Sequence, residues 1–212
     1  MFRRHLTLAA IFLVSLCTYA VPPPSVPVPR VSVIDCFGDS ITAGYRLEPG
    51  QAWPDALQSA LDQRGFHYKV VNSGISGDTS KDGVDRLQEV LRLHPAIVIV
   101  EFGGNDGLRG LPIADTRRNL DTIVATLVHS GSKVILAGIT LPPNYGSDYI
   151  KPFDETYRLI AAKYRVPLLP MLYANVYTVP GAIQQDGIHP TAKGSSLLAD
   201  TMLAALKPLL RK

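Results

Sequence analysis

Cysteine is scarce in this chain of 212 residues, which has only Cys17 and Cys36. We expect Cys17 to leave with a cleaved N-terminal segment, so the mature protein would hold one cysteine and no intramolecular disulfide. The fold must then depend on its hydrophobic core. Neither H-E-x-x-H nor a pair of C-x-x-C motifs is present, and we therefore predict no metal site.

Charge is also limited, because 18% of the residues are charged and the formal net charge is +3. This balance implies no nucleic-acid partner. Neither a P-loop nor G-x-G-x-x-G follows the first apolar run, which argues against a bound nucleotide, and we predict no cofactor. The elbow G-x-S-x-G is missing as well, so a serine hydrolase with this sequence would belong to another lineage than the α/β-hydrolases.

The N-terminus has the pattern of a secretory signal peptide over residues 1–20. The basic stretch MFRR precedes an apolar run from Leu6 to Leu16, and Thr18-Tyr19-Ala20 offers small residues where signal peptidase cleaves. The run is shorter than the roughly 20 residues that span a bilayer, so we expect cleavage rather than stable membrane insertion. The mature protein would carry a net charge of +1 and be periplasmic or secreted. The sequence does not indicate its oligomeric state.

Residues 21–30 contain five prolines and predict an extended lead-in to one domain over 31–212. Within that domain, short and nearly continuous apolar runs alternate with segments of helical period. This alternation predicts an α/β fold, a three-layer α/β/α sandwich around a parallel sheet. The expected strands are VSVIDCF (31–37), YKVV (68–71), AIVIVEF (96–102), KVILAGI (133–139) and VPLLP (166–170), and the expected helices are 53–65, 82–95, 115–131, 153–164 and 192–210.

Polar residues gather in the loops that follow these strands, where open α/β sheets bind their ligands. Ser40 follows the first strand in GDSITAGY, and Asp186 precedes His189 by three residues in QDGIHPT. A carboxylate at this spacing can orient an imidazole, which can then take a proton from a serine hydroxyl. Each feature also has a plain structural interpretation, since Ser40 suits a helix N-cap and Asp-Gly suits a turn.

Two further loop residues strengthen the catalytic interpretation. Gly74, in NSGISGDTS, lets a backbone N–H approach a ligand closely, and Asn105, in GGNDGLRG, can donate to an oxyanion while staying neutral. His67, His94 and His129 lie next to predicted strand starts, at the opposite edge of the sheet. The set therefore favours acyl transfer by Ser40, His189 and Asp186, with the amides of Ser40, Gly74 and Asn105 as the oxyanion hole.

Together the blocks FGDSITAGY, NSGISGDTS, GGNDGLRG and DGIHP resemble those of the SGNH (GDSL-type) hydrolase family, in order and over nearly the whole mature chain. LPPNYG and VPLLP resemble a narrower group within it, the periplasmic acyl-CoA thioesterase I, lysophospholipase L1 and arylesterase group. The resemblance implies a flavodoxin-like five-stranded parallel sheet and hydrolysis of carboxylic esters and thioesters. It also implies the same roles for Ser40, Asp186, His189, Gly74 and Asn105.

The small-molecule substrate is less constrained by the sequence. We expect simple or aryl esters and lysophospholipids before acyl thioesters, because no lysine cluster suggests a site for the phosphates of coenzyme A. Two alternatives stay open: an exported esterase for acetylated or feruloylated carbohydrate, and a non-catalytic lipid- or sugar-binding protein. We also expect the loop 76–83 to move on binding. The residues expected to line an apolar cleft are Ile75, Leu108, Leu111, Pro142, Pro143 and Tyr145.

Overall fold

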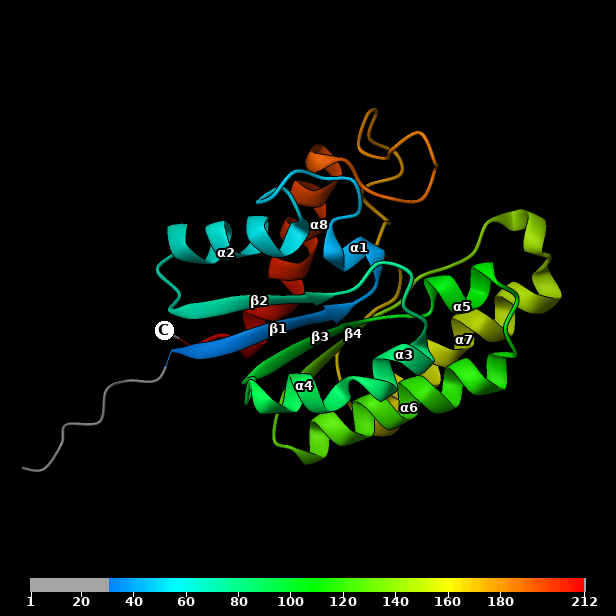
Figure 1. Ribbon diagram of the computed structural model, residues 1–212, viewed down its shortest axis with the longest axis horizontal. Coiled ribbons are helices and arrows are strands. Elements are labelled where there is room, and N and C mark those ends of the chain that lie inside the picture. The colour runs from blue at the N-terminus through cyan, green and yellow to red at the C-terminus, as the bar shows by residue number, and fades with distance from the viewer. Residues whose placement is uncertain (1–30, 212) are drawn as a thin grey trace, which may run out of the picture. The chain divides into compact units, whose positions relative to one another are not determined.

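Five parallel strands form one sheet at the centre of residues 31–211, the part of the chain that this computed structural model describes (Figure 1). The predicted signal peptide (1–20) and lead-in (21–30) lie outside the described residues. The sheet has the order β2-β1-β3-β4-β5 and confirms the predicted fold class. Its strands are β1 (Ser32–Gly38), β2 (Tyr68–Gly74), β3 (Ile97–Glu101), β4 (Lys133–Ala137) and β5 (Leu168–Leu169).

Helices cover both faces of the sheet and make the three layers (Figure 1). The connection from β1 to β2 leads toward one edge of the sheet, whereas the connections to β3, β4 and β5 lead toward the other edge. Because the crossovers are right-handed, the helices of these two sets of connections lie on opposite faces of the sheet. One face carries α2 (Trp53–Gln63) and α8 (Ala192–Leu206), and the other carries α3 (Ser80–Asp85), α4 (Leu87–Arg92), α6 (Ile113–His129) and α7 (Ser147–Tyr164). Short helices are α1 (Ser40–Ala43), α5 (Gly104–Leu108) and the 3₁₀ turns Pro143–Tyr145 and Lys207–Leu209.

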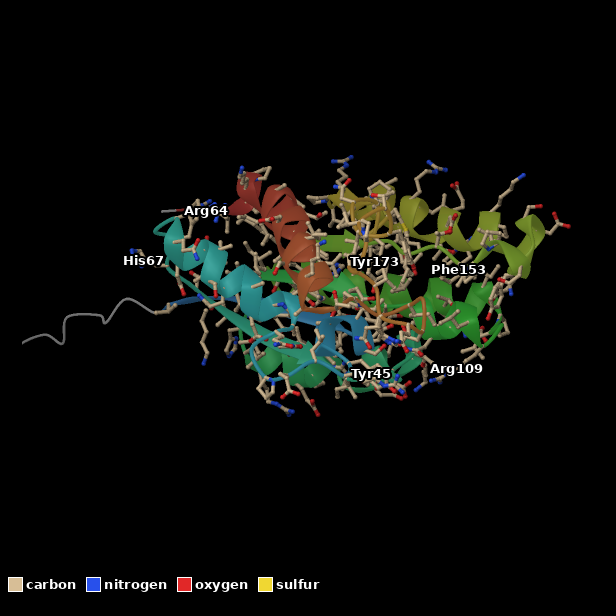
Figure 2. The ribbon with its side chains drawn as sticks, turned by 90° about the horizontal axis from the view of Figure 1, so that it is seen from above. Tyr45, Arg64, His67, Arg109, Phe153 and Tyr173 are labelled. Atoms are coloured by element: carbon tan, nitrogen blue, oxygen red, sulfur yellow. The ribbon has the colours of Figure 1, made fainter. Side chains whose placement is uncertain are left out.

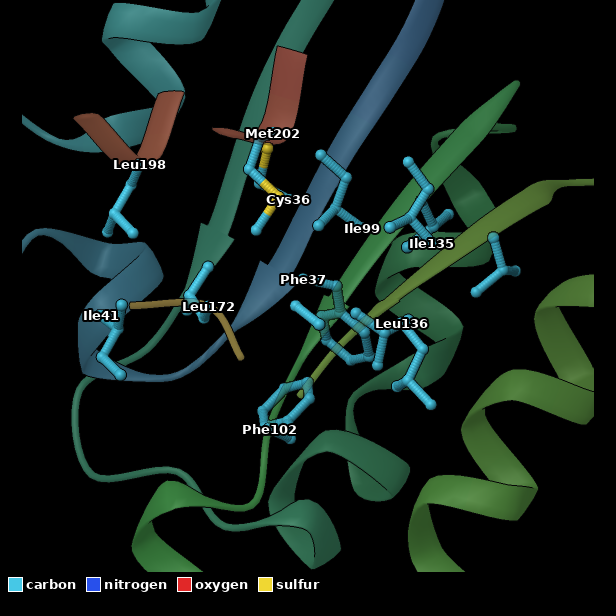
Figure 3. Close-up of a cluster of buried hydrophobic side chains, with 14 of the residues drawn as sticks. Cys36, Phe37, Ile41, Ile99, Phe102, Ile135, Leu136, Leu172, Leu198 and Met202 are labelled. Atoms are coloured by element: carbon cyan, nitrogen blue, oxygen red, sulfur yellow. The ribbon is translucent and has the colours of Figure 1, made fainter. Parts of the chain in front are cut away.

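The core lies on both faces of the sheet, because β1, β3 and β4 are buried on both sides. Figure 3 shows Cys36 beside Met202 on the α8 face, whereas the Phe37 ring meets Phe102 on the other, with centroids 4.8 Å apart. Cys36 is a buried free thiol, and burial raises its pKa well above the ordinary value. Burial of a large apolar side chain such as Phe37 or Phe102 stabilises the fold by about 1.5–3 kcal/mol relative to leaving it exposed.

Several element boundaries differ from those predicted. The expected helix 82–95 is two helices, because α3 ends at Arg86, whose side chain turns inward to the carbonyls of Ser73 and Gly38. α7 begins six residues before the expected start at Phe153 and contains Pro152 past its first turn, where the proline has no N–H to donate to the carbonyl one turn earlier. The GGNDGLRG loop holds the short helix α5, and β2 continues to Gly74 instead of ending at Val71.

The topology leaves a crevice where its crossovers diverge, beyond the carboxyl ends of β1 and β3. The segments that follow these two strands begin with α1 and α5, which carry Ser40 and Asn105. The long segment after β5 returns to the same edge before α8. Within residues 31–211, none of the helices has the length and apolar character that a membrane crossing requires.

Candidate active site

Ser40 is the first residue of α1, directly after the turn that ends β1. The N-cap is Asp39, whose carboxylate accepts from the Ile41 N–H at 3.0 Å, so Ser40 itself is not the cap. As the first helical residue, Ser40 has a backbone N–H with no acceptor inside the helix. Both its hydroxyl and this N–H therefore lie at the open end of the sheet.

His189 reaches Ser40 from a tight turn just before α8. The turn is closed by the Gln184 N–H donating to the His189 carbonyl at 2.8 Å, and Gly187 takes the left-handed conformation with φ of 72°. The imidazole Nε2 lies 2.8 Å from the Ser40 Oγ, and Nδ1 lies 2.9 Å from the Asp186 Oδ2. Ser40, His189 and Asp186 thus form a continuous hydrogen-bonded chain.

Asp186 is held as a carboxylate. Partial burial opposes its ionisation, but hydrogen bonds from the backbone N–H groups of His189 and Ile188, together with the imidazole, outweigh it and lower its pKa to about 2. With Asp186 ionised, the Nδ1 of His189 carries the proton and Nε2 faces Ser40 as an acceptor. This is the protonation pattern that a general base requires.

The structure contradicts the prediction that the Gly74 N–H belongs to the oxyanion hole. Gly74 ends β2, its N–H donates to the Asn72 side chain at 2.9 Å, and a Cβ there would lie 2.2 Å from the Ala43 nitrogen. Gly74 therefore packs α1 against β2 and lines no described cavity beside Ser40. Gly77, three residues later, lines a cavity with Ser40, Asn105 and His189.

The Gly77 N–H meets no acceptor in the described part of the chain, and the glycine has φ of 93°. The motif NSGISGDTS contains both glycines, and spacing alone did not distinguish them. Asn105 does lie at the site, where its Nδ2 is 2.9 Å from the Asp78 carbonyl and 3.2 Å from the Asp39 Oδ2. These two acceptors fix the orientation of its amide.

Two buried carboxyl groups, Asp39 and Glu101, lie beneath Ser40. The Glu101 Oε2 accepts from the Thr42 hydroxyl at 2.8 Å and from the Asp39 N–H at 3.3 Å. Burial is the main cause that raises the pKa of each acid, and the negative charge of the partner raises it further for Glu101. No lysine or arginine of the described residues forms an ion pair with either, so the pair retains a proton near neutral pH.

An apolar cavity of about 190 Å³ opens beside Ser40. Leu108 and Pro142 line it, as expected from the sequence, but Ile75, Leu111, Pro143 and Tyr145 do not. Tyr145 instead donates its hydroxyl to the Leu108 carbonyl at 2.8 Å and so supports the wall from behind. The side chains that the sequence did not single out are Ile41, Ile139, Leu141, Tyr173, Tyr177 and Ile188.

A second cavity, of about 430 Å³, meets the first at Ser40, Asn105, Ile188 and His189. Its other walls come from Tyr45, Arg46, Ser76, Gly77 and Asp186. The Tyr45 ring lies against His189, with centroids 4.6 Å apart. The reacting atoms therefore stand between an apolar chamber and a more open, polar one.

The segment 76–83, expected to be a mobile loop, is partly helical. Ser80 begins α3, is buried, and receives support from Asp106, which accepts from the Ser80 N–H at 2.8 Å. Gly83 lies inside α3, where a Cβ would come within 3.0 Å of the Phe102 ring. Only 76–79 remains outside regular structure. Within residues 31–211, no cluster of three or more His, Cys, Asp or Glu side chains suits a metal ion.

Comparison with known proteins agrees with this architecture. The chain is 44% identical to "Esterase TesA" of Pseudomonas aeruginosa over 82% of its own length and 87% of that protein. It is 41% identical to "Thioesterase 1/protease 1/lysophospholipase L1" of Escherichia coli strain K12 over 82% of each. A crystal structure of TesA superposes with a TM-score of 0.81 at 42% identity, covering 84% of this chain and 100% of that one. Residues 36–197 match the profile of the GDSL-like lipase/acylhydrolase family, and the chain therefore belongs to that family.

Proposed function

We propose that this hydrolase cleaves carboxylic esters through an acyl-enzyme formed on Ser40. The observation that carries the proposal is the chain of 2.8 Å and 2.9 Å contacts from the Ser40 Oγ through His189 to Asp186. His189 takes the hydroxyl proton as Ser40 attacks the acyl carbonyl, and then gives it to the leaving oxygen or sulfur. Water repeats the cycle and releases the acid.

The oxyanion of the tetrahedral intermediate would be held by three donors: the N–H groups of Ser40 and Gly77 and the side-chain amide of Asn105. Gly77 replaces Gly74 in this proposal because its N–H is unpaired and lies at the cavity, whereas that of Gly74 is already bonded. The Asn105 amide donates to the Asp78 carbonyl at 2.9 Å and to the Asp39 carboxyl at 3.2 Å. The oxyanion would replace Asp39 as an acceptor, because the contact with Asp39 is the longer of the two.

The apolar cavity is the proposed acyl site. Its 190 Å³ corresponds to about six water-sized groups, so a short or medium acyl chain would fill it and a longer one would extend outward. The names of the relatives add thioesters and lysophospholipids to the substrates to be tested. The apolar lining supports esters of alkanoic acids longer than acetate as substrates, in preference to carbohydrates that carry acetyl or feruloyl groups.

We further propose export to the periplasm or beyond, with residues 1–20 removed as a signal peptide and 21–30 as a lead-in to the catalytic domain. The basic start and the short apolar run support this. Mass spectrometry of the protein purified from an exporting host tests it, and an intact N-terminus would contradict it.

Two measurements test the catalytic proposal. Ser40→Ala should fold normally but lose turnover and labelling by a fluorophosphonate, because within residues 31–211 Ser40 carries the one hydroxyl that hydrogen-bonds the His189 ring. Ser59→Ala, which changes an exposed serine of α2, is the matched control and should keep both. Labelling of Ser40→Ala at the wild-type rate would refute the nucleophile assignment.

A panel of 4-nitrophenyl esters from acetyl to palmitoyl, with an acyl-CoA and a lysophospholipid, tests the acyl site. We expect kcat/KM to rise from acetyl to a medium chain and then to level off or fall. A maximum at acetyl would favour the carbohydrate-esterase alternative, and absence of turnover on every substrate would favour a binding protein.

A further inference from the structure

Arg46 is the one arginine or lysine that lines a cavity together with Ser40 in the described residues. It lines the second cavity together with Ser76 and Gly77. The apolar cavity, on the other side of Ser40, has no basic residue other than His189 in its lining. The two sides of the reacting centre therefore differ in that only the second cavity carries a guanidinium.

The backbone and side chain of Arg46 are both held in place. Its φ of 58° is in the left-handed region, which a residue other than glycine rarely adopts without support. Its guanidinium lies over the Tyr45 ring, 5.0 Å from the centroid, and the Gln184 amide donates to the Tyr45 carbonyl at 2.8 Å. Because Tyr45 also contacts the His189 ring, the cation has a defined position relative to the catalytic base.

The charge of Arg46 is not neutralised by an acid. Among residues 31–211, Arg46 forms no ion pair. Asp186 lines the same cavity, but its oxygens are occupied by two backbone N–H groups and by His189. A second guanidinium, that of Arg109, donates to the carbonyl of Gly77, which lines the same cavity, at 2.7 Å. Figure 2 shows Arg64 and His67 at one end of the domain, away from Tyr45 and Arg109.

We propose that Arg46 binds a phosphate group on the leaving alcohol or thiol, so that the enzyme prefers esters with an anionic leaving group over neutral esters of the same acid. This inference rests on the proposed function, because it assigns the apolar cavity to the acyl chain and hence the polar one to the leaving group. A guanidinium offers a planar fork of donors that suits phosphate oxygens.

The test compares substrates that share an acyl group and differ in phosphate. Hexanoylglycerol and hexanoylglycerol 3-phosphate form the oxygen-ester pair, and hexanoyl-N-acetylcysteamine and hexanoyl-CoA form the thioester pair. The readout is the ratio of kcat/KM for the phosphorylated substrate to that for the neutral one. The two pairs distinguish a lipid headgroup from the phosphates of coenzyme A as the source of the anion.

Three variants accompany the wild-type protein. Arg46→Asn removes the charge and suits the left-handed backbone, so it should fold. We expect it to lower the ratio about threefold to tenfold, mainly through KM, as expected for loss of one charge-assisted contact at an open site. Arg46→Lys should restore part of the ratio. Arg64→Gln, at the far end of α2, is the control and should keep the wild-type ratio.

A ratio for Arg46→Asn equal to that of the wild type in both pairs would overturn the inference, as would a ratio insensitive to salt between 50 mM and 500 mM, because an exposed ionic contact is screened. Failure of the proposed function would look different, since the wild-type protein would then turn over none of the four substrates.

Discussion

Individual side chains near the sheet edge carry ionisable groups in unusual surroundings. Asp35 is fully buried on β1, where its Oδ1 accepts from the Ser73 hydroxyl at 2.6 Å and its Oδ2 meets no donor in the part of the chain described. Burial raises its pKa to about 6, although Ser73 and the charge of Arg86 act in the other direction. Ionising this acid therefore costs stability.

The stability of the protein should depend on this group in a defined pH window. An unfolded aspartate has a pKa of about 3.9, so between about pH 4 and pH 6 the folded state binds more protons and unfolding becomes easier as pH rises. Asp35→Asn cannot ionise, and its free energy of unfolding should fall less over that window, by up to about 3 kcal/mol. Urea denaturation at pH 4, 5 and 7 measures the slope, and parallel curves for the two proteins would contradict the prediction.

Asn105 makes a second prediction about a single side chain. Asn105→Ala removes one proposed oxyanion donor and should lower kcat by about 10²–10³, because that donor acts most strongly in the transition state. Asn144→Ala, in the exposed turn before α7, is the control for loss of an amide and should keep kcat. Steady-state kinetics on a 4-nitrophenyl ester measure both, and an effect confined to KM would argue for a role in substrate binding alone.

Among the helices and loops, the connection from β2 to α3 carries Gly77, whose N–H is one of the proposed oxyanion donors. Arg86, at the junction of α3 and α4, fastens this connection to the sheet. Its guanidinium bonds the Asp78 carboxylate at 2.6 Å and the carbonyls of Ser73 and Gly38 at 2.7 and 2.8 Å. It also lies over the Phe37 ring, 4.5 Å from the centroid. One side chain thereby links β1, β2 and the loop.

Arg86→Met should consequently destabilise the protein by about 3–5 kcal/mol, since it leaves the largely buried Asp78 carboxylate and two carbonyls without their donor. It should also lower kcat at temperatures where the variant is still folded, because the Gly77 loop loses its anchor. Arg92→Met, on the exposed end of α4, should change stability by no more than about 0.5 kcal/mol. Thermal denaturation and kinetics at 15 °C separate the two effects; equal melting temperatures for both variants would refute the anchoring role.

The folded unit as a whole begins at Val31, where the chain divides from Met1–Arg30. Because the core, the sheet and both cavities are made from residues after this point, a chain of residues 31–212 should fold alone. We expect one cooperative thermal transition and a kcat/KM within about twofold of the full mature protein. Calorimetry and ester hydrolysis measure these, and an insoluble or inactive product would show that earlier residues are needed.

The fold class and the members of the Ser40–His189–Asp186 chain followed from local signals, whereas the order of the strands was read only from the structure. Continuous Val- and Ile-rich runs predict buried parallel strands, and the rule that ligands bind beyond the carboxyl ends of such strands brings Ser40, Asn105 and His189 to one edge. Asp186 could be found because it lies three residues from His189, where both share one turn. For these features the necessary information is contained in short stretches of chain and in the topology they imply.

Packing between distant segments decided the rest. Gly74 and Gly77 both suit a loop, and only the contact of Gly74 with Ala43 and the free N–H of Gly77 distinguish them. The break at Arg86 depends on carbonyls of β1 and β2, and the two cavities take their walls from segments up to about 150 residues apart, as Ser40 and His189 are. Periodicity and motif spacing determine which face or edge a residue reaches, whereas its neighbours there depend on tertiary contacts that no local pattern contains.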